Sequence, residues 1–170
     1  DEHFFIVGSG MAERYHIRFF EMIERPNSVD FQSLTEEMCG FNVAGPKSRE
    51  ILQRLSNQDL SNKNWPFMRS GNLSIAGVSC LALRISFTGD LGWEIYCKAN
   101  KQQIVYEALV REAVNEKGGP VGSRALMSLR IEKGYGSWSR EYSPEIWPHE
   151  CGLDKLCKLD KEFLNKAALS

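Results

Sequence analysis

Two periods of hydrophobic and polar positions divide the chain into predicted helices and strands. Apolar residues at helical spacing predict helices over residues 11–24, 101–117 and 122–133, with a shorter helix opening at Gly45-Pro46. Alternation, or a compact run of β-forming residues, predicts strands over residues 3–8, 29–34, 39–44, 73–75, 78–86 and 93–97. The two-residue connection at 76–77 predicts a hairpin, and Arg-Pro-Asn at residues 25–27 is expected to end the first helix.

The order of these elements favours an α+β fold with antiparallel sheets and packed helices. A strand followed by an amphipathic helix over residues 4–23 is echoed faintly over residues 93–114. Each would be half of a strand-helix-strand-strand-helix-strand unit rather than part of a doubly wound parallel sheet. Residues 134–148 are aromatic and irregular. Such a segment either lines or covers a binding site or fills a gap under a loop, and both interpretations stay open.

One stretch, residues 84–96, stands out as a strand, a glycine turn and a second strand. Gly89 and Gly92 bracket Asp-Leu, so the chain can reverse sharply there. After the turn, period-two alternation places Trp93 and Ile95 on one face of the strand, and Glu94 and Tyr96 on the other. A lone carboxylate in these apolar surroundings must lie in water at the sheet surface or accept specific hydrogen bonds, because burying an unpaired charge is too costly.

Composition bounds the class of protein. The 170 residues are 42% hydrophobic and 25% charged, which is ordinary for one globular domain or a piece of a larger chain. The net charge of −1 gives no electrostatic reason to expect a nucleic acid or an acidic membrane as partner. No apolar run approaches the length of about 18 residues that a transmembrane helix needs, so no membrane-spanning segment is expected.

The five cysteines are odd in number and lack paired spacing. This pattern favours free thiols in a reducing compartment, the cytoplasm or, in a eukaryote, the mitochondrial matrix. His149 lies near Cys151 and Cys157, but the spacing matches no common zinc pattern, so no metal site is predicted.

Four motifs, in order and spacing, resemble the glycine-cleavage T-protein (aminomethyltransferase) family. Residues 84–96 are similar to its (Y/F)-T-G-E-x-G-x-E signature, and three further stretches agree with it. These are Phe-Asn-Val-Ala-Gly-Pro at 41–46, Ser-Leu-Arg-Ile-Glu-Lys-Gly at 128–134 and Asp-Lys-Glu-Phe-Leu at 160–164. The resemblance covers nearly the whole chain and is closer to the folate-binding region of dimethylglycine and sarcosine dehydrogenases.

The resemblance implies a fold of two similar α+β subdomains around a central folate site. On that basis the chain is expected to be a single folate-binding region truncated at both ends. Residues 1 to about 45 would be the remainder of the first subdomain, and residues 46–170 the second. The cofactor implied is tetrahydrofolate, and an FAD, if there is one, would belong to a separate domain outside these residues.

The resemblance also implies cofactor-binding residues in the second half of the chain. Glu94 falls on the family's glutamate that hydrogen-bonds the pterin ring. Phe87 stands where the family has a tyrosine, so the ring can still pack against the cofactor but a hydroxyl contact is gone. An Arg-Asp pair of the family falls on Leu126-Met127, and Arg124, two residues earlier, could substitute. Surface roles for Glu94 and Arg124 remain as alternatives.

Four further residues align with the walls of the pterin pocket. Phe5, Val7 and Ser9 fall on the strand that lines it, where the family often has asparagine in place of Ser9. Trp138 aligns near an aromatic residue at the edge of the folate site, although core packing is the more common fate of tryptophan.

No catalytic group is predicted within the 170 residues. The family's essential aspartate belongs to a stretch before the predicted strand at His3, and no nucleophile–base or paired-carboxylate constellation stands in its place. The implied function is binding of tetrahydrofolate in an enzyme that passes it a one-carbon unit from a methylated or aminomethylated amine. The alternative is a non-catalytic folate-binding or regulatory module. The expected partners are those small molecules and the rest of a multidomain chain.

Overall fold

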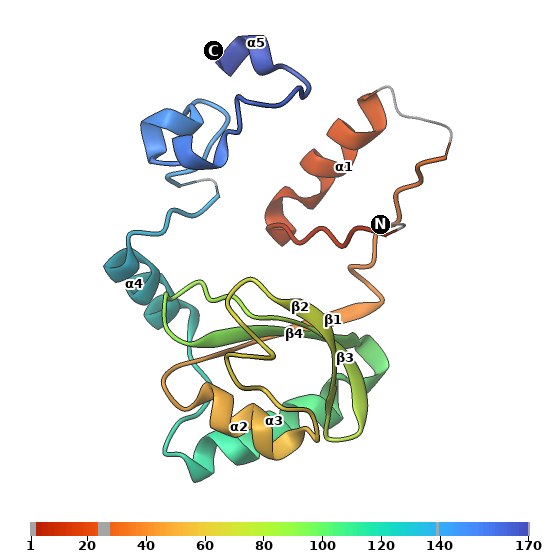
Figure 1. The fold of residues 1–170 in the computed structure, drawn as a ribbon, viewed down its shortest axis with the longest axis vertical. Coiled ribbons are helices and arrows are strands. Elements are labelled where there is room, and N and C mark those ends of the chain that lie inside the picture. Colours follow the sequence, from red (N-terminus) through yellow and green to blue (C-terminus); the bar gives the residue numbers. More distant parts are fainter. Residues whose placement is uncertain (1–2, 24–27, 139, 170) are drawn as a thin grey trace. The chain divides into compact units, whose positions relative to one another are not determined.

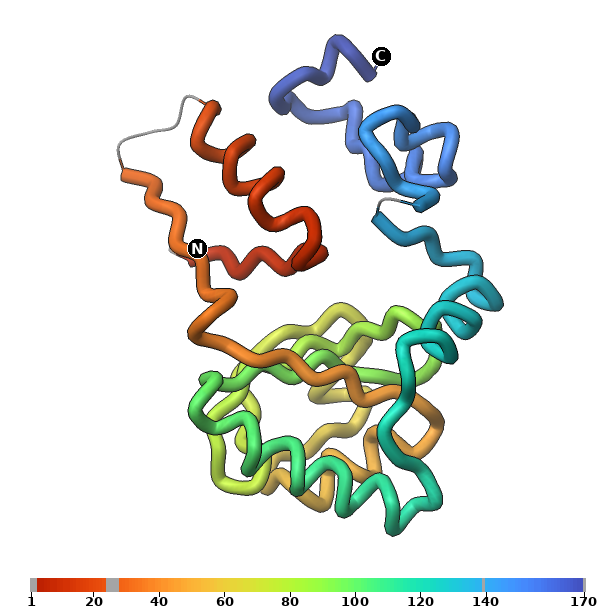
Figure 2. The backbone as a smooth tube through the Cα atoms, turned by 180° about the vertical axis from the view of Figure 1, so that it is seen from behind, coloured from red at the N-terminus to blue at the C-terminus, as the bar shows by residue number. Residues whose placement is uncertain are grey.

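The computed structural model describes residues 3–23, 28–138 and 140–169. The chain divides into two units by its internal contacts. The sheet unit is Asp30–Tyr135, and the flanking unit combines Asp1–Val29 with Gly136–Ser170. Both are traced in Figures 1 and 2.

The sheet unit is built on a four-stranded antiparallel sheet in the order β1-β4-β3-β2. Its strands are β1 (Met38–Ala44), β2 (Ser70–Ile75), β3 (Val78–Leu83) and β4 (Gly92–Lys98). The first helix, α2 (Ser48–Leu55), follows β1, and the short η2 (Ala99–Lys101) leads from β4 into α3 (Gln102–Asn115). The last helix of the unit is α4 (Ser123–Lys133). Helices α2 and α3 cover one face of the sheet (Figure 1).

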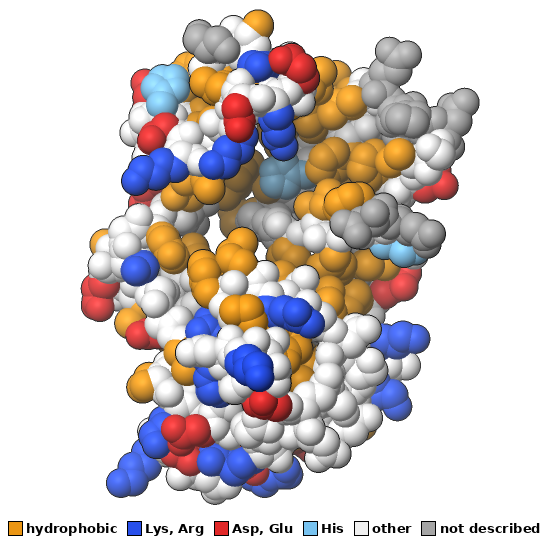
Figure 3. Space-filling model, viewed as in Figure 1, with side chains coloured by type: hydrophobic (Ala, Val, Ile, Leu, Met, Phe, Trp, Pro, Cys, Tyr) orange, Lys and Arg blue, Asp and Glu red, His pale blue; other side chains and the backbone are white. Residues whose placement is uncertain are grey.

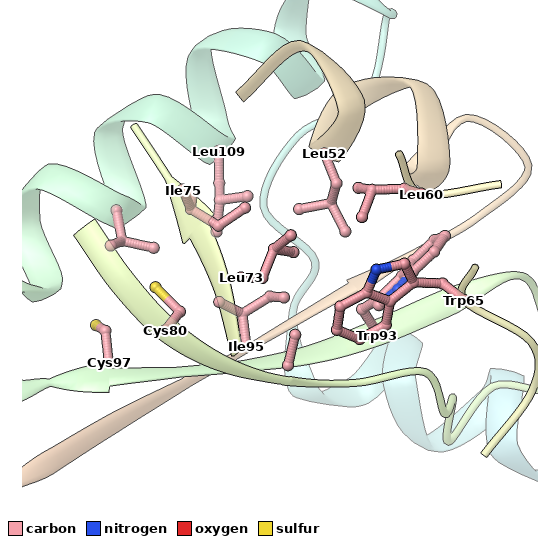
Figure 4. Close-up of a cluster of buried hydrophobic side chains, with 12 residues drawn as sticks. Leu52, Leu60, Trp65, Leu73, Ile75, Cys80, Trp93, Ile95, Cys97 and Leu109 are labelled. Atoms are coloured by element: carbon pink, nitrogen blue, oxygen red, sulfur yellow. The ribbon is translucent and has the colours of Figure 1, made fainter. Parts of the chain in front are cut away.

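Strand alternation and helix amphipathicity meet in a single hydrophobic core between the sheet and these helices (Figure 4). On β4, Trp93, Ile95 and Cys97 are buried and the residues between them are partly exposed. Helix α3 contributes Val105 and Leu109. The cluster of buried side chains in this core consists of Leu52, Leu60, Trp65, Leu73, Ile75, Cys80, Ala82, Trp93, Ile95, Cys97, Val105 and Leu109.

The flanking unit has little buried surface. It contains η1 (Gly10–Ala12), α1 (Glu13–Met22), η3 (Pro148–Cys151), η4 (Asp154–Leu156) and α5 (Lys166–Leu169). No residue of α1 is buried, and its Tyr15, Phe19 and Met22 are all exposed. Hydrophobic side chains gather on the visible surface over α1 (Figure 3). None of the helices in the described part of the chain is long and apolar enough to cross a bilayer.

The α+β class is confirmed, as are the predicted helices and the strands at 39–44, 73–75 and 93–97. The predicted strands at 3–8 and 29–34 are wrong, because both segments are irregular. The predicted repeat of residues 4–23 over residues 93–114 therefore lacks the strand that would open its first copy. Within the described residues neither segment has a partner strand. A strand forms only by hydrogen bonding to a neighbouring strand, and period-two alternation of side chains does not show whether such a neighbour exists. The predicted strand 78–86 ends at Leu83. The expected end of the first helix at 25–27 lies outside the described residues.

Candidate ligand-binding site

Glu94 lies on the face of the sheet opposite helices α2 and α3. It sits near the start of β4, where the register pairs it with Asn42 of β1 on one side and Leu83 of β3 on the other. Its side chain is partly exposed, whereas the flanking Trp93 and Ile95 are buried in the core. Within the described residues no ion pair involves Glu94. The carboxylate is therefore available to donors from outside the sheet.

Tyr96 is the side chain that holds this carboxylate. Its hydroxyl donates a hydrogen bond to Oε2 of Glu94 at 2.6 Å. Burial, and then the bond to Glu94, raises the pKa of the Tyr96 hydroxyl well above its ordinary value, so the hydroxyl stays a donor at physiological pH. Gly40 of β1 is paired with Tyr96, and a Cβ at that glycine would lie 2.8 Å from the tyrosine ring. The ring packs directly against the glycine backbone.

The loop between β3 and β4 holds the turn that the sequence predicts. Gly89 has a φ of 78°, a left-handed conformation that glycine adopts without strain. Gly92 has a different role, because a Cβ there would lie 2.9 Å from Cβ of Ser86. The Ser86 and Thr88 hydroxyls are 3.1 Å apart and close the loop around Phe87, which is partly buried. Phe87 thus lies in the loop that leads directly into the Glu94 strand.

Two guanidinium groups stack on the buried indole of Trp93. The guanidinium carbon of Arg84 is 4.8 Å from the ring centroid, and that of Arg49 is 5.1 Å from it. Arg84 is only 9% exposed, and its Nη1 donates a long hydrogen bond of 3.4 Å to the Gly92 carbonyl. Burial, and then the charge of Arg49, lowers the pKa of Arg84. These contacts fix the indole beneath the strand that carries Glu94.

Arg124 is the second residue of α4 and is exposed. Arg130, on the same helix, is buried and donates to the Tyr135 carbonyl at 2.9 Å, a structural contact. The helix ends at Lys133 and is followed by Gly134, which has a φ of 78°. A ligand-binding role for Arg124 stays a prediction.

The other four predicted residues belong to the flanking unit. Phe5, Val7 and Ser9 are exposed and lie in irregular backbone before η1, with the Ser9 carbonyl accepting from Ala12 at 2.9 Å. Trp138 packs its ring 6.3 Å from Tyr15 and lines a hollow of about 240 Å³. The other lining residues are Tyr15, Tyr142, Ser143, Pro144, Ile146, Pro148, Cys151 and Leu153. Trp138 and the 142–148 stretch thus contribute to a concave surface within the flanking unit.

The structure therefore places the predicted residues in two sets. Glu94, Phe87 and Arg124 belong to the sheet unit, and Phe5, Val7, Ser9 and Trp138 to the flanking unit. Sequence reasoning did not single out Tyr96 or Gly40 as part of the site. The alternation of β4 could have pointed to Tyr96, but no sequence signal pairs Gly40 with it. Among the described residues no group of three metal-ligating side chains occurs.

Comparison with known proteins gives consistent relatives. Residues 1–161 match the family model described as the GCVT N-terminal domain. Mitochondrial dimethylglycine dehydrogenase of Mus musculus is 35% identical over 172 residues, which is 99% of this chain and 20% of that protein. An aminomethyltransferase of Thermoanaerobacter sp. (strain X514) is 32% identical over 170 residues, 99% of this chain and 46% of that protein. The chain thus spans about a fifth of the first relative and about half of the second.

The chain is also similar to a second dehydrogenase and to a solved oxidase structure. Mitochondrial sarcosine dehydrogenase of Homo sapiens is 34% identical over 174 residues, 99% of this chain and 19% of that protein. Among solved structures, the heterotetrameric sarcosine oxidase of Corynebacterium sp. U-96, in complex with pyrrole 2-carboxylate, aligns with a TM-score of 0.46 and 20% identity. That alignment covers 54% of this chain and 45% of the other.

Proposed function

Since the chain belongs to the family of GCVT N-terminal domains, we propose that it is the tetrahydrofolate-binding part of an aminomethyltransferase-like or dimethylglycine-dehydrogenase-like enzyme. The whole protein would transfer a one-carbon unit from a methylated or aminomethylated amine to tetrahydrofolate. The relatives named for those activities align along 99% of the chain, which supports this assignment.

The proposal rests on the partly exposed carboxylate of Glu94, which the Tyr96 hydroxyl holds in place. A carboxylate offers about four acceptor positions, and the Tyr96 hydroxyl uses one of them. The remaining positions can accept two parallel N–H bonds, one on each oxygen, from the 2-amino-pyrimidinone edge of a reduced pterin. We assign the apolar contacts of the ring to Leu83, which is paired with Glu94 across the sheet, and to Phe87, in the loop before β4. This donor and acceptor chemistry fits the cofactor.

We assign the catalytic groups of the reaction, and any flavin, to parts of the protein other than the described residues. No side chain here is proposed as a catalytic group, and none is assigned to a flavin. Phe5, Val7, Ser9, Arg124 and Trp138 stay predictions as further folate contacts. The amine, the compartment and the division of the chain near residue 45 are proposals of the same kind.

A non-catalytic folate-binding or regulatory module is the second candidate. It is favoured by the departures from the family pattern at Phe87, Ser9 and Leu126-Met127. The two candidates differ in turnover, since the enzyme forms a one-carbon derivative of tetrahydrofolate from a methylated amine and the module only binds folate.

Calorimetric titration of the full-length protein with 5-formyltetrahydrofolate tests the shared part of both candidates. Saturable binding should be lost in Glu94→Ala and kept in Glu107→Ala, a matched control on α3, which covers the opposite face of the sheet. Equal affinity in the two variants would contradict the assignment of Glu94. Assaying the same protein for turnover with dimethylglycine and sarcosine then separates the enzyme from the module.

A further inference from the structure

Tyr96 and Glu94 form a fixed pair on the face of the sheet opposite α2 and α3. They are two residues apart on β4, so both side chains project from the same face. The distance of 2.6 Å from the tyrosine hydroxyl to Oε2 of Glu94 is in the range of a charge-assisted O–H···O⁻ bond. Hydrogen bonds of this kind are about twice as strong as those between neutral groups.

The position of the Tyr96 ring is set by the strand beside it. In the β1–β4 register Gly40 lies directly opposite Tyr96, and the ring occupies the space that a Cβ at Gly40 would need. On the other side, Leu81 of β3 is the partner of Tyr96. The hydroxyl is thus held by its ring as well as by its hydrogen bond, and the raised pKa of Tyr96 keeps it protonated.

We propose that Tyr96 is the positioning residue of the folate site, holding the Glu94 carboxylate in the one orientation that presents two acceptor positions to the pterin. The proposal rests on the proposed function of Glu94. An unrestrained surface glutamate samples many rotamers and loses that freedom when a ligand binds. A glutamate already held by Tyr96 has less freedom to lose, so the hydroxyl strengthens binding without touching the ligand.

If Tyr96 has this role, its effect on binding is limited to one edge of the ligand. A hydroxyl that acts through Glu94 affects only those ligand groups that Glu94 binds, which are the 2-amino group and the adjacent ring N–H. A tyrosine that merely supported the fold would affect every ligand of the site to the same extent. The two roles are separated by a ligand that lacks the 2-amino donor.

The test is calorimetry on the full-length protein with two ligands, 5-formyltetrahydrofolate and its 2-desamino-2-methyl analogue. Tyr96→Phe removes the hydroxyl and keeps the ring against Gly40. Tyr106→Phe is the matched control, because Tyr106 is half exposed on α3, near Phe41 and away from Glu94. We expect Tyr96→Phe to weaken binding of the parent ligand about tenfold, by the loss of one hydrogen bond to a charged group. The analogue keeps only the ring N–H donor to Glu94, so its binding should be weakened clearly less than that of the parent ligand.

Three outcomes are informative. The expected pattern supports the positioning role. The role of Tyr96 is overturned if Tyr96→Phe leaves the affinity for the parent ligand within twofold, or if it weakens binding of both ligands equally. In that case Glu94→Gln, measured beside it, should still weaken binding of the parent ligand, and the assignment of the folate site to Glu94 stands. If Glu94→Gln itself binds as tightly as the unmodified protein, the proposed function of this site fails and the role of Tyr96 fails with it. Gly40→Ala, which displaces the ring, provides a second variant should Tyr96→Phe not fold.

Discussion

Replacing Arg84 by methionine should stabilise the chain, although it removes a contact with a core tryptophan. Arg84 is 9% exposed, and among the described residues no carboxylate pairs with its guanidinium. The positive charge of Arg49, which stacks on the same indole, repels that of Arg84. An unpaired ion buried in a protein costs several kcal/mol, roughly 3 to 5, after relaxation and water penetration.

The favourable contacts of Arg84 are smaller than this cost. A desolvated cation over tryptophan contributes about 2 kcal/mol. The 3.4 Å bond to the Gly92 carbonyl is long and contributes at most about 0.5 kcal/mol. Methionine has a similar length and no charge, and it can keep the apolar contact with Trp93. Arg84→Met should therefore raise the free energy of unfolding by about 1 kcal/mol.

Arg49 provides the matched comparison, because it stacks on the same ring from helix α2. Unlike Arg84, it donates to the Leu60 carbonyl and to the side chain of Asn62. Arg49→Met leaves those acceptors without their donor and should lower the free energy of unfolding by about 1 to 2 kcal/mol. Urea denaturation of the two variants and the unmodified chain measures both values. A loss of stability in Arg84→Met as large as that in Arg49→Met would refute the reasoning.

Three further predictions concern single residues. Gly89→Ala should cost about 1 to 2 kcal/mol in denaturant unfolding, because alanine is strained at a φ of 78°, and an unchanged midpoint would count against the turn. Gly40→Ala should weaken binding of 5-formyltetrahydrofolate about as much as Tyr96→Phe, with no further loss when the two are combined; additive losses would show independent roles. Burial raises the pKa of the Cys80 thiol to about 11, so it should resist iodoacetamide at pH 8, where the partly exposed cysteines react more readily; equal labelling of all five would contradict its burial.

The elements that sequence predicts correctly are those whose signal is local. Helix α3 and strand β4 carry their period in their own residues, and the glycine turn at Gly89 is a local requirement for positive φ. The family was also predictable, since four motifs in fixed order carry it, and the family match confirms it. The segments at 3–8 and 29–34 failed because a strand exists only with a partner, which no local pattern supplies.

Only the site residues within a sequence motif could be predicted. Glu94 could be singled out because a charged residue interrupts an apolar strand, and its position on the face opposite the core follows from alternation with Trp93. The pairing of Gly40 with Tyr96 could not be predicted, because it depends on the strand order that places β1 beside β4. The folate contacts assigned to the other residues remain predictions, because they depend on the ligand.

A crystal structure of the full-length protein with 5-formyltetrahydrofolate tests the central claim most directly. The two oxygens of Glu94 should lie about 2.7 to 3.1 Å from the 2-amino nitrogen and the adjacent ring nitrogen of the pterin, with the Tyr96 hydroxyl still on Oε2. A pterin bound elsewhere, or one whose 2-amino edge faces away from Glu94, would contradict the account.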